Sequence, residues 1–152
     1  MTSLSRQEAR EGAVRIELPF PPSDLTPHAK GHWKPKAAAT KRYRHLCAKE
    51  AMAQGLRGMS AERVRARITI HRPNLRRDYQ NCISCFKAGV DGIADVIGID
   101  DRYWTIDFVE GEIARPHGRV VVEIEPADTW QHISEPLGRV IASIPLPKRE
   151  AS

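Results

Sequence analysis

The chain has 152 residues, 28% of them charged, and a formal net charge of +5. No stretch approaches the roughly 18 consecutive apolar residues that a membrane span requires, and the polar N-terminus lacks the apolar core of a signal peptide. Three cysteines are too few for a disulfide framework, which favours a reducing compartment. We therefore expect a cytoplasmic protein with no membrane partner, whose basic charge permits a polyanionic partner.

The N-terminal half of the chain predicts one strand and one long helix. Residues 1–12 read as a flexible lead, and 13–18 alternate apolar and polar residues, as a strand does. Prolines then interrupt regular structure over 19–27. A helix should follow from about 35 to 56, with a proline in its first turn.

The segment 28–50 is strongly basic and contains no acidic residue before Glu50. Its basic side chains are either a solvated helix face or a surface for a phosphate backbone, where each cation can replace a condensed counterion. Trp33 could stack on a base or anchor the core. The lysines and arginines that we assign to a DNA-binding surface here are Lys30, Lys34, Lys36, Lys41, Arg42 and Arg44.

Three further strands are expected in the second half, at 63–71, 103–110 and 119–125. The last two should form an antiparallel hairpin through a turn at 114–118. With the helices, the order predicts a single α+β domain over 13–126, in which two main helices pack against one mixed sheet. Residues 127–152 are expected to be a partly disordered extension.

A central helix is predicted from 79 to 97, with Asp78 as its N-cap and Gly98 at its end. One stripe is apolar and should be buried: Tyr79, Cys82, Ile83, Phe86, Val90, Ile93 and Ile97. The opposite stripe is polar and should be exposed: Gln80, Ser84, Lys87, Asp91 and Asp95.

The acidic groups around this helix allow two interpretations. Asp78 can be a simple cap, Lys87 and Asp91 a surface ion pair worth a few tenths of a kcal/mol, and Asp100 and Asp101 loop residues. Alternatively, carboxylates at both ends of a rigid element with a lysine between them suggest a divalent metal and a phosphate.

The pair Cys82 and Cys85 has the spacing of a redox motif near a helix start. Cys82, however, falls in the apolar stripe, and no second Cys or His pair is near enough to complete a zinc site. We therefore expect neither a redox nor a zinc site at this pair.

Four segments together resemble the RusA-type Holliday junction resolvases. They are LPFPPS at 18–23, HW at 32–33, RRDYQN at 76–81 and KAGVDGIADVIGIDD at 87–101. The similarity covers about residues 14 to 126 and is specific as a combination. It implies a small homodimeric, Mg²⁺-dependent endodeoxyribonuclease of mixed α/β fold that cuts four-way DNA junctions in recombination and repair. Many members of that family are carried by phages and prophages.

The resemblance also assigns roles to individual residues. It makes Asp78, Lys87 and Asp101 catalytic, and it places the metal at Asp78 and Asp101 with Asp100 beside them. Gln80 stands where the family has a second aspartate, so its amide would take a metal-ligand position. The arginine pair that opens the motif joins the DNA-binding set: Arg76 and Arg77.

Two features depart from the family pattern. The spacing from Asn81 to Lys87 is about three residues longer than the shortest family pattern, close to one helical turn. Gln80 puts metal binding in doubt, so the alternative function is a junction-binding protein with impaired or lost cleavage. A third hypothesis, from another class, is a basic RNA- or protein-binding module whose acidic residues are only caps and loop groups.

Overall fold

The chain forms a four-stranded mixed sheet in the computed structural model, which describes residues 13–25 and 33–127. The strand order is β1-β4-β2-β3. β2 and β3 run parallel, whereas β4 is antiparallel to both β1 and β2. The strands are β1 (Val14–Pro19), β2 (Val64–His71), β3 (Trp104–Glu110) and β4 (Arg119–Pro126).

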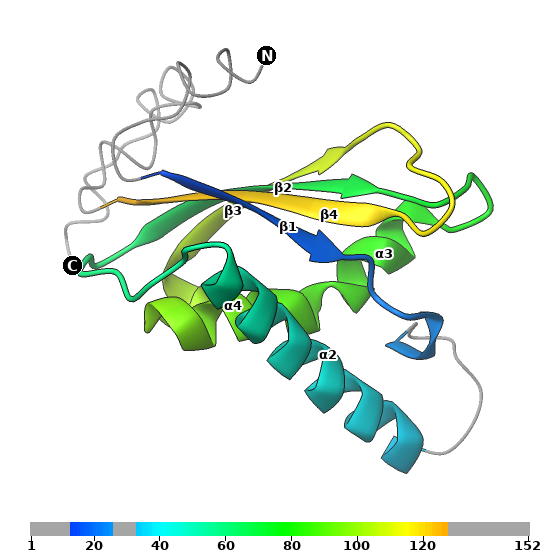
Figure 1. Ribbon diagram of the computed structural model, residues 1–152, viewed down its shortest axis with the longest axis horizontal. Helices are drawn as coiled ribbons and strands as arrows, with labels where there is room; N and C mark the ends of the chain where they lie inside the picture. The colour runs from blue at the N-terminus through cyan, green and yellow to red at the C-terminus, as the bar shows by residue number, and fades with distance from the viewer. Residues whose placement is uncertain (1–12, 26–32, 128–152) are drawn as a thin grey trace, which may run out of the picture.

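The helices lie against one face of this sheet (Figure 1). The predicted α+β class with one mixed sheet and two main helices is therefore confirmed. Among the described residues no helix is long and apolar enough to cross a membrane. The helical elements are η1 (Ser23–Leu25), α2 (Trp33–Ala53), α3 (Tyr79–Cys85), α4 (Lys87–Ile97) and η2 (Asp101–Tyr103).

Strand alternation separates the two faces of the sheet, because successive side chains point to opposite sides. The helix-facing side chains of β2 are all buried: Val64, Ala66, Ile68 and Ile70. On the opposite face, one cross-strand row carries alternating charges: Arg15, Glu123, Arg67 and Asp107. The basic side chain of Arg67 in β2 is therefore flanked by a carboxylate on each neighbouring strand.

The predicted hairpin between the last two strands is wrong. β4 pairs with β1 and β2, and β3 pairs with β2 alone. The burial pattern agrees with this arrangement: Val120, Val122 and Ile124 are buried on the helix-facing side of β4, and Val121 on the opposite face is also buried between the flanking strands β1 and β2. β3 exposes most of one face, which suits an edge position.

The connection from β2 to β3 contains the predicted central helix. Asp78 caps the start of this helical region and Gly98 caps its end, as predicted. The single helix expected over 79–97 is instead divided at Phe86 into α3 and α4. Phe86 is fully buried, meets Tyr43 edge-on at 6.3 Å, and presses its ring against Gly89, so its packing fixes the junction between the two helices.

Candidate active site

Lys87 gathers two carboxylates on the exposed side of α4. Its Nζ donates to Oδ1 of Asp91 at 2.7 Å and to Oδ2 of Asp101 at 2.9 Å. The lysine side chain is 61% exposed, whereas those of Asp91 and Asp101 are 28% and 30% exposed. Solvent and a ligand can therefore reach the ammonium group, while the two carboxylates are partly shielded.

Each member of this cluster is placed by a different local rule. Asp91 lies one helical turn after Lys87, where side chains face each other. Asp101 reaches the same lysine because η2 turns the chain between α4 and β3.

Partial burial acts to lower the pKa of Lys87, but the hydrogen bonds to Asp91 and Asp101 outweigh it and raise that pKa above its ordinary value. The lysine is therefore a cation at neutral pH.

Asp100 has a different role from its neighbour. Its Oδ1 accepts from the backbone N–H of Arg102 at 3.0 Å and so caps η2. That hydrogen bond lowers the pKa of the exposed Asp100 carboxyl, with the positive charge of Arg102 adding to the effect. Asp100 thus orients the turn that carries Asp101 through its contacts with Arg102.

Asp78 is the N-cap of α3, and its Oδ2 accepts from the backbone N–H of Asn81 at 2.9 Å. Gln80 is exposed in the first turn of the same helix. Asp101 follows the end of α4, and among the described residues Asp78, Asp91 and Asp101 do not form one group of metal-binding side chains. The structure therefore joins Lys87 and Asp101, and the contact that it shows for Asp78 is the cap of α3.

The carboxylates around Lys87 have the chemistry of a magnesium site, although among the described residues no three Asp, Glu, His or Cys side chains form one metal-binding group. Magnesium takes oxygen ligands, keeps several waters, and is often bound by one or two carboxylates with a phosphate. Asp91 and Asp101 converge on the ammonium group of Lys87, so both carboxylates can serve as metal ligands. Asp91 was not among the predicted ligands, and its helical spacing from Lys87 is the signal for it.

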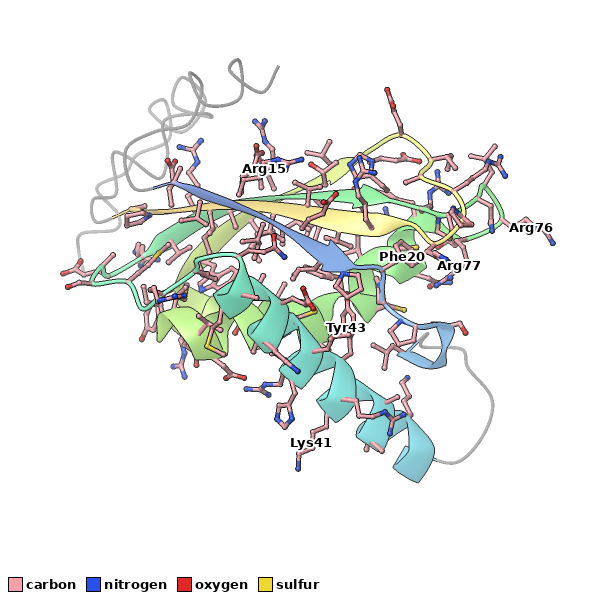
Figure 2. All side chains as sticks on the ribbon, in the orientation of Figure 1. Arg15, Phe20, Lys41, Tyr43, Arg76 and Arg77 are labelled. Carbon is pink, nitrogen blue, oxygen red and sulfur yellow. The ribbon has the colours of Figure 1, made fainter. Side chains whose placement is uncertain are left out.

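The six predicted DNA-binding residues of the segment 28–50 fall into three groups. Lys41 and Arg42 are exposed on α2, and Lys36 is partly exposed there; Lys41 points away from the sheet (Figure 2). Arg44 instead donates two hydrogen bonds of 2.8 Å to Asp95, which tie α2 to α4. That hydrogen-bonded pair lowers the pKa of Asp95. Lys30 and the side chain of Lys34 lie outside the described residues.

The arginine pair is presented by a fixed loop between β2 and α3. The side chain of Asn74 accepts from the backbone N–H groups of Arg76 and Arg77. Buried Arg72 donates to the carbonyl of Arg77 and to the Glu110 carboxylate. Arg76 is exposed at the tip of the molecule (Figure 2), so it is free to meet a ligand in a loop whose backbone is already ordered.

The cysteines behave as core residues. Cys47, Cys82 and Cys85 are buried and form no disulfide. Burial raises the pKa of Cys47 to about 12 and also raises that of Cys82. Because the thiolate is the reactive form, neither position favours redox or metal chemistry.

No family model matches this sequence. The chain is similar to an uncharacterized protein of Xylella fastidiosa (strain Temecula1), with 35% identity over 114 residues. The matched region covers 72% of this chain and 74% of that protein. The similarity thus extends over most of both proteins.

Proposed function

Since the chain belongs to the same family as this Xylella fastidiosa protein, whose description names no activity, we propose a function from its own site: a Mg²⁺-dependent endonuclease that cuts four-way DNA junctions. The observation that carries the proposal is the exposed Lys87 held between Asp91 and Asp101. It lies within 76–101, the segment that resembles the RusA-type motif. A lysine beside paired carboxylates is what phosphodiester cleavage needs.

The residues divide the chemistry between them. Asp91 and Asp101 would hold the magnesium ion, which when bound polarises the scissile phosphodiester and lowers the pKa of an attacking water. Lys87 would place its positive charge where negative charge develops on the phosphate oxygens. Because its pKa is raised, Lys87 offers this charge across the neutral pH range. A bound phosphate would compete with Asp91 and Asp101 for the same ammonium group.

The basic side chains of α2 and the loop before α3 would hold the DNA. Lys41, Arg42 and Arg76 are exposed, and none of them forms an ion pair with a carboxylate of the described residues. Contacts of this kind fix position and orientation on the phosphate backbone without reading sequence. That property suits an enzyme that selects a branched shape.

A homodimer is part of the proposal, because the resemblance implies a homodimer and two catalytic aspartates, Asp78 and Asp101, which belong to no common metal-binding group of three side chains among the described residues of one chain. In the proposed dimer the α3 start of one copy lies near the α4 cluster of the other, and a two-fold axis makes this contact reciprocal, so that both sites are formed in the same way. Asp78 would then complete the site of the second subunit while it still caps its own helix.

The alternative function is junction binding with weak or lost cleavage. Gln80 supports it, because a neutral amide replaces a carboxylate two positions after Asp78. An amide oxygen is a poorer ligand for a hard dication than a carboxylate.

The test is junction cleavage under single-turnover conditions with and without Mg²⁺. We expect Mg²⁺-dependent nicking that falls by about a hundredfold or more in Lys87→Ala, the scale seen when one transition-state donor is removed. Junction affinity in EDTA should change little. Asp107→Asn, on the opposite face of the sheet, is the control and should cleave normally. Equal cleavage by Lys87→Ala and the wild type would exclude the proposed site, and binding without cleavage in the wild type would select the alternative.

A further inference from the structure

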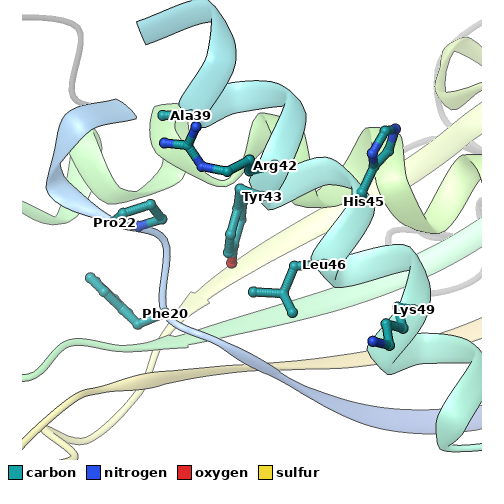
Figure 3. A pocket seen from close by; sticks show the side chains of 8 residues that line it. All are labelled: Phe20, Pro22, Ala39, Arg42, Tyr43, His45, Leu46 and Lys49. Carbon is teal, nitrogen blue, oxygen red and sulfur yellow. The ribbon is translucent and has the colours of Figure 1, made fainter. Parts of the chain in front are cut away.

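A cavity of about 700 Å³ opens between α2 and the segment that follows β1 (Figure 3). Phe20 and Pro22 form one wall, and Tyr43 and Leu46 of α2 face them. Its size lies in the range of roughly 300–1,000 Å³ typical of small-molecule sites. Leu46 is 40% exposed, so the apolar interior is accessible from solvent.

The rim of this cavity is basic. Arg42, His45 and Lys49 border it, and none of its described lining residues is acidic. Arg42 and Lys49 are seven positions apart, roughly 10 Å along the helix axis, with Leu46 between them. The cavity therefore combines an apolar, partly aromatic interior with positive charge on both sides of its opening.

The aromatic walls are held in place before any ligand arrives. The Tyr43 hydroxyl donates to the carbonyl of Pro19, which fixes its ring against the interior. The Phe20 ring lies under the guanidinium of Arg77, 4.9 Å from ring centroid to Cζ. Arg77 thus links this wall to the loop that begins the candidate active-site segment. A preorganised apolar wall costs a ligand less ordering on binding.

We propose that this cavity receives one unpaired nucleotide of the DNA strand, with its base against Phe20 and Leu46 and its flanking phosphates on Arg42 and Lys49. The inference rests on the proposed DNA substrate and adds a site for an unstacked base. Base stacking on aromatic side chains is sequence-tolerant, as a shape-selective protein requires. A strand fits better than a free nucleotide because the positive charges continue along α2 to Lys41 and Lys36, beyond the reach of one nucleotide.

The experiment compares two glutamate substitutions that add the same charge to the same helix. Leu46→Glu places a carboxylate in the cavity, whereas Met52→Glu changes another exposed apolar residue of α2 that does not line it. Affinities are measured in EDTA, so that no cleavage occurs, for a duplex with one unpaired adenine and for the same duplex fully paired. Thermal melts confirm that both variants fold, and Phe20→Leu provides a second variant that keeps an apolar wall without the ring.

The wild type and Met52→Glu should prefer the unpaired-base duplex by about tenfold, the scale of one stacked base. Leu46→Glu and Phe20→Leu should lose most of that preference. For the fully paired duplex, Leu46→Glu should have the affinity of Met52→Glu, and Phe20→Leu should have the affinity of the wild type. The idea is overturned if the wild type shows no preference, if both glutamate variants lose it equally, or if deoxyadenosine monophosphate competes as well as the unpaired-base duplex. Since no cleavage is involved, these outcomes are independent of whether the protein is a nuclease.

Discussion

At position 80 an amide stands where the RusA-type motif has a carboxylate, and the structure leaves this side chain exposed in the first turn of α3. Gln80→Asp should raise the single-turnover cleavage rate by about tenfold at limiting Mg²⁺, because a carboxylate binds a hard dication better than an amide. The added charge also lies at a helix N-terminus, where it stabilises by about 0.3–1 kcal/mol. A Mg²⁺ titration of both proteins measures the first effect and a urea titration the second.

Ser84→Asp is the matched control, since Ser84 lies one turn further along the same exposed stripe. It adds an equal charge without occupying the motif position. If Gln80→Asp and Ser84→Asp give superimposable Mg²⁺ titrations, then position 80 has no role in metal binding, and the correspondence between this chain and the motif needs revision.

The individual site residues were predictable to different degrees. The cap at Asp78 and the pairing of Lys87 with Asp91 follow from local spacing alone, and both are present. That Asp101 joins Lys87 depends on the direction in which η2 turns the chain, which no local pattern specifies. Asp100 and Asp101 are adjacent in sequence, yet only Asp101 meets the lysine.

At the scale of elements, α2 and α4 pack closely where Gly92 faces the backbone of Arg44. A Cβ at position 92 would lie 2.3 Å from the Arg44 carbonyl oxygen, so a larger residue must push the helices apart. Gly92→Ala should therefore destabilise the fold by about 1–3 kcal/mol, the usual cost of overpacking, although alanine favours a helix by up to about 1 kcal/mol. Urea unfolding at neutral pH measures the net change.

Gly58→Ala is the control, because the nearest atom to its added Cβ, the Ile97 carbonyl oxygen, is 3.9 Å away. It should be neutral or slightly stabilising, since alanine restricts the unfolded chain. A Gly92→Ala protein as stable as the wild type would show that α2 and α4 can shift without cost, and that the Arg44–Asp95 pair does not depend on their close approach.

The helices and strands were predictable from sequence to within a few residues. An element that is buried on one face has apolar residues at the spacing of a helix or of a strand, and this spacing is visible in the sequence. Strand neighbours were not. Periodicity shows which side chains of β3 and β4 face the core, but pairing is non-local, and the chain passes over β2 to insert β4 beside β1. The apolar run Val120–Val122 was the signal that β4 is internal. The division of the helix at Phe86 likewise depends on a partner in another element, Tyr43.

At the scale of the whole molecule, the proposed dimer leads to the last prediction. In the proposed dimer each active site takes Asp78 from one subunit and Lys87 with Asp101 from the other. Asp78→Asn removes the carboxylate while asparagine still caps α3, and Asp101→Asn removes a predicted metal ligand. Each variant alone should be inactive, because both of its sites lack one group.

Mixed dimers of the two variants should recover activity. In such a dimer one site lacks both aspartates, and the other is complete. Random assembly of equal amounts makes half of the dimers mixed, so nicking of a four-way junction should return to about a quarter of the wild-type rate. A mixture of Lys87→Ala and Asp101→Asn is the control and should stay inactive, because these two residues belong to the same half of the site. If the first mixture also stays inactive, then Asp78 does not act across subunits; if Asp78→Asn alone cuts at the wild-type rate, then Asp78 is only a helix cap.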